Sequence, residues 1–250
     1  MANPYFSFKK FTIWQDQAAM KVTTDACLLG AWASDHLQKK HLGQFSPATT
    51  IFRLADVGTG TGLLAMMIHQ KNPSFLVEGL ELDPVAAQQA IHNVAQAGFE
   101  QQIKIHTVDV TTYCPDAMYD IIISNPPFYQ DDLKATAQKR NWAFHDDTLT
   151  LAQLFRFISE NLSETGKFFL LLPWRREQEV NDLLLLNNLS LLEKIAVKTA
   201  PHSPAHRLLL AGKRMDEPIQ LLEQEICITD ETGSYSNRFR ELLTDYYLTL

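Results

Sequence analysis

The chain is poor in cysteine, with three in 250 residues, and it has no long hydrophobic run. Cys27, Cys114 and Cys227 lie far apart and match no metal-ligand spacing, so neither a disulfide framework nor a zinc site is predicted. We expect buried, unreactive thiols in a reducing compartment. No apolar segment approaches the ~18 residues of a membrane span, and the N-terminus lacks the apolar stretch of a secretory signal. The sequence therefore predicts a cytoplasmic protein with no metal and no membrane partner.

Positive charge is also scarce, because the formal net charge is −7. This balance argues against a protein that holds nucleic acid through a general electrostatic field. A local basic patch is still compatible with it, and solvated surface charge is the alternative interpretation of each basic pair. The candidate pairs are Lys9–Lys10, Lys139–Arg140, Arg175–Arg176 and Lys213–Arg214.

What the chain does contain is a regular alternation of strand and helix patterns. Apolar strand patterns cover residues 51–57, 75–82, 103–108, 119–124, 167–172, 191–198 and 207–213. Helical patterns cover residues 63–71, 84–98, 150–162 and 175–187. This order predicts an α/β fold with a mostly parallel seven-stranded sheet and helices on both faces. Ligands of such sheets bind beyond the carboxyl ends of the strands, so the strand-to-helix turns are where we expect the chemistry.

No linker divides the chain, and we expect a single domain over residues 1–250. It consists of an N-terminal extension (1–50), a core (51–215) and a C-terminal extension (216–250). The segment Tyr5–Trp14 alternates enough to form a strand or a short hairpin, and Tyr235–Leu250 is expected to contain a short packing helix. No obligate protein partner is indicated.

A glycine-rich turn, DVGTGTG, follows the first strand at residues 56–62. Glycine lets the backbone approach a ligand with no Cβ in the way. The order D-x-G-x-G-x-G resembles motif I of class I methyltransferases rather than the G-x-G-x-x-G of dinucleotide enzymes. The resemblance implies a Rossmann-like methyltransferase fold with S-adenosyl-L-methionine as cofactor; a tight turn without a ligand is the alternative. The turn residues expected to bind the cofactor are Asp56, Gly58, Thr59, Gly60 and Gly62.

The next two strands end in acidic side chains. An acidic residue at the second strand end accepts hydrogen bonds from ribose hydroxyls. The family resemblance gives this role to Glu81 and leaves Asp83 as the cap of the helix that starts at Pro84. The same resemblance implies that Asp109, at the third strand end, accepts a hydrogen bond from the adenine amino group of the cofactor.

The most specific pattern is Asn125-Pro126-Pro127-Phe128, at the end of the fourth strand. It resembles the [NDS]-P-P-[YFW] motif of amino methyltransferases, although a rigid turn with no catalytic role would also contain two prolines. An exocyclic amino nitrogen of adenine is a poor nucleophile, because its lone pair is delocalised into the ring. The Asn125 side-chain oxygen and the Pro126 carbonyl are predicted to accept its two N–H bonds. Phe128 offers a stacking face, and in-line positioning supplies much of the catalysis.

The segments outside these motifs resemble one family of amino methyltransferases. They are residues 11–17, 21–32, 201–207 and 235–248. The chain is similar along nearly its whole length to the bacterial tRNA1(Val) adenine-N6 methyltransferases, which modify the adenine following the anticodon. This implies a transfer RNA substrate, and it implies that Lys21, Thr24 and Asp25 close over the methionine end of the cofactor. Thr24 or Asp25 could instead only cap a helix.

Other interpretations remain open at this stage. The loop 129–147 contains Trp142 and His145, which could contact substrate or only pack. A protein N5-glutamine methyltransferase would present an amide nitrogen to the same two acceptors, but those enzymes carry a separate helical N-terminal domain. A non-enzymatic RNA-binding relative is the third alternative, against which the complete motifs argue.

Overall fold

The structure is a computed structural model that describes residues 3–18, 20–41, 51–127, 149–215 and 220–250. Its strands are β1 (Tyr5–Ser7), β2 (Thr12–Trp14), β3 (Phe52–Val57), β4 (Phe75–Glu81), β5 (Ile103–Thr107), β6 (Tyr119–Ser124), β7 (Leu162–Pro173), β8 (Leu189–Lys198), β9 (Ala205–Arg214) and β10 (Leu222–Cys227). Its helices are α1 (Thr24–His41), α2 (Leu63–Lys71), α3 (Pro84–Gln96), α4 (Leu151–Asn161), α5 (Glu177–Leu186) and α6 (Asn237–Leu243), with a short 3-10 turn at Trp174–Arg176.

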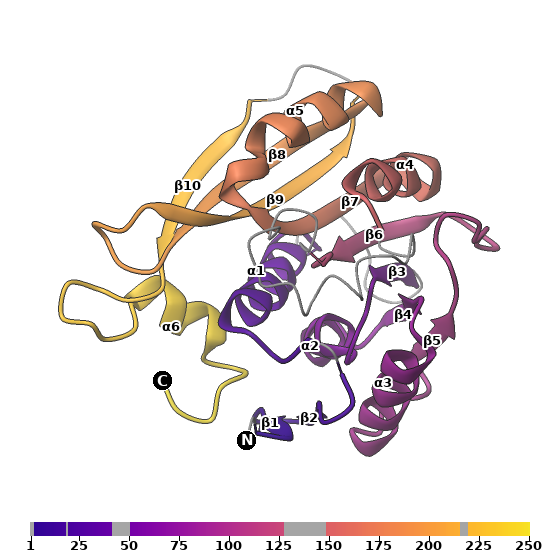
Figure 1. Ribbon diagram of the computed structural model, residues 1–250, viewed down its shortest axis with the longest axis horizontal. Coiled ribbons are helices and arrows are strands. Elements are labelled where there is room, and N and C mark those ends of the chain that lie inside the picture. Colours follow the sequence, from indigo (N-terminus) through magenta and orange to yellow (C-terminus); the bar gives the residue numbers. More distant parts are fainter. Residues whose placement is uncertain (1–2, 19, 42–50, 128–148, 216–219) are drawn as a thin grey trace, which may run out of the picture.

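Eight of these strands form one central sheet in the order β10-β8-β9-β7-β6-β3-β4-β5 (Figure 1). Within this described sheet only β9 runs antiparallel to its neighbours, β7 and β8. The predicted α/β fold with a mostly parallel sheet is therefore confirmed. The sheet has one strand more than the seven predicted.

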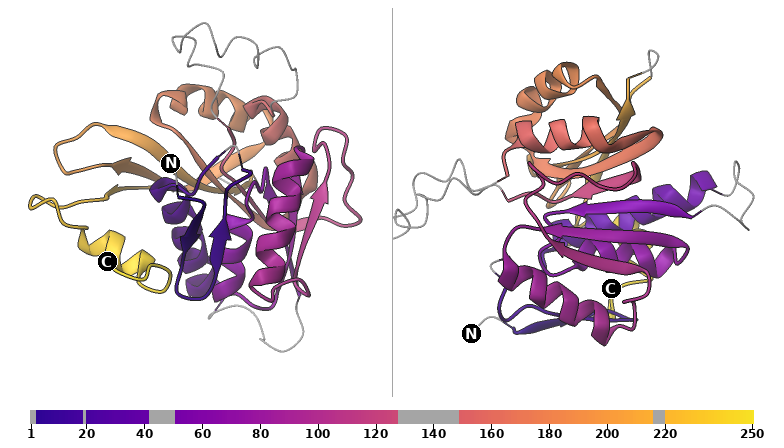
Figure 2. Two further views of the ribbon diagram at one scale, coloured as in Figure 1. Left: turned by 60° about the horizontal axis from the view of Figure 1, so that its bottom comes forward. Right: turned by 90° about the vertical axis from the view of Figure 1, so that its right-hand side faces the viewer.

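The alternation of side chains along the strands divides the core in two. Ile121, Ile123 and Phe169 pack on the face that carries α1, α2 and α6. Ile122 and Phe168 pack on the opposite face, beneath α4 and α5. Figure 2 shows the helices on either side of the sheet. Because both faces are covered, the central strands are continuous apolar runs rather than alternating ones.

The two ends of the chain pack together over α2. The predicted hairpin is confirmed, since β1 and β2 pair antiparallel. Phe8 then forms a bridge with Tyr247, which follows α6, and the Tyr246 hydroxyl donates to the Met67 carbonyl at 2.9 Å. The predicted C-terminal packing helix corresponds to α6.

The additional strand, β10, lies at the edge of the sheet and is mostly exposed. Its sequence, LEQEIC, has no apolar alternation that would predict a strand. Its acidic side chains instead pair with the neighbouring strand, where Lys194 contacts Glu223 at 2.5 Å and Lys198 contacts Glu225 at 2.7 Å. Such cross-strand charge pairs exist only once β8 and β10 are adjacent.

Several boundaries differ from the predicted ones. The helix expected over 175–187 begins at Glu177, after the 3-10 turn. β7 begins at Leu162 instead of Lys167, because Leu162 pairs with Tyr119 across a register shift.

The expectation of buried thiols is wrong for Cys114, which is exposed in the irregular connection between β5 and β6, and connections generally lie on the surface. Cys27 is buried as expected, and burial raises the pKa of its thiol to about 12.

Helix α4 begins with a capping box. The Thr150 hydroxyl accepts the Gln153 amide, and the Gln153 side chain accepts the Thr150 amide at 2.8 Å. Replacing Thr150 with alanine is expected to lower the free energy of unfolding by about 1 kcal/mol, measured by urea denaturation. An unchanged denaturation midpoint would show that water replaces this cap without cost.

Candidate active site

The carboxyl ends of four parallel strands lie side by side at one edge of the sheet, in the order β6, β3, β4, β5. Val57 pairs with Ser124 on one side and with Leu80 on the other. The residues that follow these pairs therefore leave the sheet at one level, and neighbouring strands are about 4.8 Å apart. Along this edge the structure brings together four predicted site residues: Asn125, Gly58, Glu81 and Asp109.

The proline turn is tied to the glycine turn just below this edge. The buried Ser124 hydroxyl donates to the Val57 carbonyl at 2.7 Å. Ser124 immediately precedes Asn125, and Val57 immediately precedes Gly58. This bond therefore holds the starts of the two turns together, which is a positioning role that the sequence did not reveal.

The side chain of Asn125 is poised to accept a hydrogen bond. Its Oδ1 atom is buried and has no hydrogen-bond partner among the described residues. A buried acceptor without a partner costs about 1–3 kcal/mol, so such an atom calls for a functional explanation. Pro126 is buried and Pro127 is half-buried, whereas Phe128 lies outside the described residues, as do Trp142 and His145.

The glycine turn presents open backbone. Gly58 and Gly60 have φ angles of 70° and 55°, in the left-handed region that favours glycine. A Cβ added at Gly58 would meet no atom within 4 Å, and at Gly60 the nearest atom is the Gly58 carbonyl oxygen at 4.0 Å. A ligand can therefore approach this backbone closely. Gly62, also at positive φ, is the N-cap of α2.

Asp56 lies beneath the turn and is fully buried. Its Oδ2 atom accepts the Thr59 hydroxyl at 2.6 Å and the Ala65 amide at 3.1 Å. These bonds connect the end of β3, the turn and the first turn of α2. Burial raises the pKa of Asp56 to about 6, and the two hydrogen bonds offset only part of this effect.

The raised pKa of Asp56 predicts a pH-dependent contribution to stability. The folded protein holds a proton on Asp56 between about pH 4 and pH 6, where the unfolded chain has lost it, so this contribution is full at lower pH and disappears as the pH rises through about 6. Asp56→Asn removes the titration. Between pH 4 and 7 we expect wild type to lose about 2 kcal/mol of unfolding free energy relative to the variant in urea titrations. Parallel stability curves would contradict this.

Glu81 supports the same turn from the next strand. Its carboxylate accepts the Gly60 amide at 2.8 Å and the Asp83 amide at 3.0 Å. An ionised carboxylate has about four lone-pair positions, so ligand hydroxyls can be accepted in addition. The predicted cap at Asp83 is confirmed, because its side chain accepts the Val85 amide at 2.9 Å.

Asp109 is exposed beyond the end of β5. Its Oδ1 atom accepts both the amide and the hydroxyl of Thr111, at 2.8 and 2.7 Å, and these bonds lower the pKa of the carboxyl. This local turn fixes the side chain at the outer end of the row of strand ends.

The segment that contains Lys21 is attached to the glycine turn by Asn93. The fully buried Asn93 amide exchanges hydrogen bonds with the Trp14 backbone at 2.9 and 2.8 Å, and it donates to the Thr61 carbonyl at 2.9 Å. The Lys21 ammonium donates to the carbonyls of Gln15 and Ala18. The sequence signal for Asn93 was its place as a polar residue within the apolar stripe of α3, at helical spacing from Ala90 and Ala86.

Thr24 and Asp25 begin α1, but neither is its cap, because Thr23 accepts the Ala26 amide. The Thr24 side chain lies against the Tyr247 hydroxyl. The Asp25 carboxylate contacts the Arg207 Nε atom at 3.2 Å and the His206 Nε2 atom at 3.4 Å, both at the start of β9. These two partners were part of the sequence resemblance, but without an assigned role.

No helix among the described segments has the length and apolar character needed to cross a membrane. In the same residues, histidine, cysteine and acidic side chains form no cluster that could hold a metal ion. The open glycine turn and the neighbouring carboxylates instead suit a nucleoside with hydroxyl and amino donors, and carboxylates here would repel a phosphate.

The fold is shared with solved methyltransferase structures. A "predicted O-methyltransferase" from Agrobacterium tumefaciens superposes with a TM-score of 0.66 at 17% identity, covering 88% of this chain and 96% of that one. A ribosomal protein L11 methylase from Lactobacillus delbrueckii superposes with a TM-score of 0.53 at 17% identity, covering 82% and 84%. The chain therefore has the fold of the class I S-adenosylmethionine-dependent methyltransferases.

Sequence relatives identify the family. Residues 35–184 match the model of the methyltransferase small domain. A tRNA1(Val) (adenine(37)-N6)-methyltransferase from Parabacteroides distasonis is 37% identical over the whole of both chains. Proteins of the same name from Dyadobacter fermentans and Pseudoalteromonas translucida are 35% and 34% identical, covering 98% of this chain in each case and 98% and 99% of theirs. The chain belongs to the tRNA1(Val) (adenine(37)-N6)-methyltransferase family.

Proposed function

We propose that the protein transfers a methyl group from S-adenosyl-L-methionine to the exocyclic N6 atom of the adenine 3′ to the anticodon of valine tRNA. The observation that carries the chemistry is the pairing of Val57 with Ser124, which places the glycine turn beside Asn125. The Asn125 Oδ1 atom is a buried acceptor that has no partner in the described structure. The names of the full-length relatives support the RNA substrate.

In this proposal the cofactor lies along the edge from β5 to β3. Asp109 accepts its adenine amino group through Oδ2, and Glu81 accepts its ribose hydroxyls. The backbone of Gly58 and Gly60 borders its methionine portion, which Lys21, Thr24 and Asp25 close from the other side. Asp56, Thr59 and Gly62 act through the turn, because their contacts hold its shape.

The chain itself orients the reacting nitrogen. When bound, S-adenosyl-L-methionine supplies an electrophilic methyl group on a sulfonium. Asn125 Oδ1 and the Pro126 carbonyl accept the two N–H bonds of the adenine amino group, and Pro127 keeps the turn rigid. Phe128 stacks on the base. As the nitrogen bonds to the methyl carbon, the carbon–sulfur bond would break and leave a neutral thioether. The nitrogen would become acidic at the same time, so water takes the proton and no strong base is required.

We further propose one domain over residues 1–250, in which the core 51–215 carries the cofactor and the extensions 1–50 and 216–250 complete the fold around it. The packing of α1 and α6 on the same face as α2 supports this arrangement. We place the enzyme in the cytoplasm, where its tRNA substrate is found, and expect no obligate protein partner.

The deciding experiment supplies tritiated S-adenosyl-L-methionine together with unmodified tRNA, protein or DNA in parallel. Nucleoside analysis of the labelled tRNA is expected to yield N6-methyladenosine, and a transcript with guanine at the target position is expected to remain unlabelled. Label in methylglutamine instead would assign the chain to the protein N5-glutamine methyltransferases. Cofactor binding without any transfer would favour an inactive RNA-binding relative.

A further inference from the structure

The N-terminal hairpin exposes an aromatic pair near the active site. The Tyr5 and Trp14 rings are 41% and 38% exposed, and their centroids lie 5.3 Å apart with a tilt of 54°. The other aromatic side chains of the hairpin pack against the body of the protein, with Phe8 and Phe11 buried and Phe6 partly buried. An exposed aromatic face offers a surface on which an unpaired base can stack, whatever its sequence.

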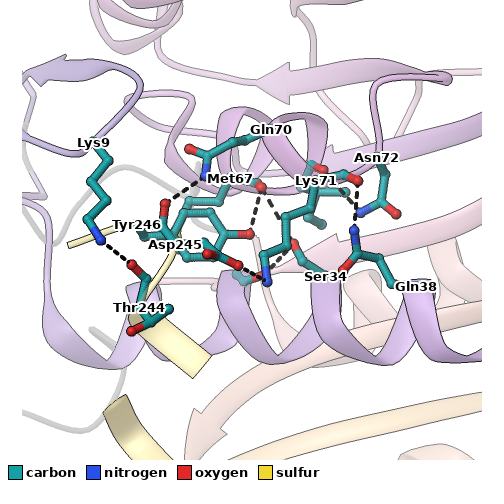
Figure 3. A network of polar contacts seen from close by, with 12 residues as sticks. Lys9, Ser34, Gln38, Met67, Gln70, Lys71, Asn72, Thr244, Asp245 and Tyr246 are labelled. Carbon is teal, nitrogen blue, oxygen red and sulfur yellow. Dashed lines mark hydrogen bonds and ion pairs between the residues drawn. The ribbon is translucent and has the colours of Figure 1, made fainter. Parts of the chain in front are cut away.

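The opposite end of the hairpin borders a basic cleft of about 390 Å³. The side chains lining the cleft are Lys9, Lys10, Gln38, Gln70, Lys71 and Asp245. Lys71 contacts Asp245 at 2.8 Å, while Lys9 donates to the neutral Thr244 carbonyl at 2.6 Å (Figure 3). One carboxylate therefore faces three ammonium groups, in a chain whose net charge is −7.

Hydrogen bonds tie the segments that carry these lysines to the C-terminal segment. The Lys9 amide donates to the Tyr246 carbonyl at 2.8 Å, and the Gln70 side chain donates to the Asp245 carbonyl at 2.9 Å. In Figure 3 the Gln70 contact joins α2 to the C-terminal segment, and the Lys9 side chain joins the hairpin to the same segment at Thr244. The backbone positions that carry the positive charge are therefore fixed before any ligand binds, which reduces the entropic cost of binding.

The aromatic pair and the cleft lie along one path from the active site. The Trp14 backbone is bonded to Asn93, which also bonds the glycine turn at Thr61. Lys71 lies at the far end of α2, which begins directly after that turn and whose nine residues span about 14 Å. An RNA arm that extends from the active site could therefore reach both features.

We propose that this hairpin, together with Lys71, is a second RNA-binding surface that contacts the substrate outside its target base. Tyr5 and Trp14 stack on an unpaired base, and the three lysines contact backbone phosphates. Lysine suits this role because its flexible point charge binds phosphates without reading sequence. An acidic protein needs such a local patch to hold a polyanion. The proposal rests on the proposed function, because it takes RNA as the substrate.

The test measures affinity for unmodified tRNA across a salt series. The double variant Lys9→Gln/Lys10→Gln is expected to bind more weakly, and the slope of log K against log salt should fall in magnitude by about 1.4–1.8. Trp14→Ala is expected to weaken binding about fivefold or more without changing the slope, because stacking releases few counterions. Lys104→Gln is the matched control, since Lys104 also donates to a backbone carbonyl, Glu100, at 2.6 Å.

The cofactor affinity and the melting temperature of each variant are measured as well. A variant that keeps both but binds tRNA more weakly has lost an RNA contact and not its fold. If the double variant melts early, Lys10→Gln alone decides the question, with an expected slope change of about 0.7–0.9. If the wild-type protein methylates tRNA and the hairpin variants bind tRNA as tightly as Lys104→Gln does, the proposed second surface is wrong and the proposed function stands. Wild type that transfers no methyl group to tRNA would refute the proposed function, and this surface with it.

Discussion

Replacing Asn125 with alanine is expected to lower the rate of methyl transfer to tRNA by about 10²–10³-fold. The variant removes one of the two acceptors proposed to orient the amino group, and losing one preorganised hydrogen-bonding group at a reacting centre has effects of this size. Cofactor affinity should change little, because the glycine turn and Glu81 are untouched. Single-turnover transfer from tritiated S-adenosyl-L-methionine and calorimetric titration of the cofactor measure the two quantities.

Stability separates this catalytic role from a structural one. Asn125 Oδ1 is buried without a partner in the described structure, so the loss of this oxygen breaks no hydrogen bond among the described residues and should not by itself lower the free energy of unfolding. Asn125→Asp keeps an acceptor oxygen and should retain more activity than the alanine variant. Asn187→Ala, at the end of α5, is the control for the loss of an asparagine away from the site. Unchanged turnover of tRNA by Asn125→Ala would refute the catalytic assignment.

Glu81→Ala is expected to weaken S-adenosyl-L-methionine binding by about 10- to 100-fold. A hydrogen bond to a charged group contributes about 1.5–3 kcal/mol, and the ribose hydroxyls would lose such an acceptor. The variant also removes the acceptor of the Gly60 amide, so the turn itself becomes less ordered. Calorimetry on the folded variant gives the affinity, and transfer assays at saturating cofactor show whether the chemical step survives.

Two further variants locate the cause of the Glu81 effect. Glu81→Gln keeps an acceptor oxygen for the Gly60 amide but lacks the negative charge, so an intermediate affinity is expected. Glu164→Ala removes an exposed glutamate on β7, far from the carboxyl edge of the sheet, and should bind the cofactor like wild type. Wild-type affinity in Glu81→Ala would exclude Glu81 as the ribose acceptor.

Much of the site could be predicted because its elements are local. The glycines of the turn, the Asp83 cap and the proline pair each act over a few consecutive residues. A parallel sheet then brings successive strand ends to one edge, so the neighbourhood of Asn125, Gly58, Glu81 and Asp109 follows from the order of the elements.

The contacts between distant segments could not be predicted in this way. Three such contacts join Ser124 to Val57, Asn93 to Trp14 and Asp25 to Arg207. A local pattern can mark one member of a pair, as the polar position in the apolar stripe of α3 marks Asn93, but it does not identify the partner. β10 was missed for the same reason, since its glutamates have partners only on β8.

The sequence by itself thus determined the class of fold, the glycine turn and the residue types of the proposed reacting centre, because backbone conformation and hydrogen-bonding capacity are properties of short segments. Only the tertiary structure decided which polar groups support those residues, that Asn125 Oδ1 is buried without a described partner, and that the hairpin lysines meet Lys71 at one cleft. Burial and electrostatic neighbourhood depend on segments far apart in the chain, and these come together only when the protein folds.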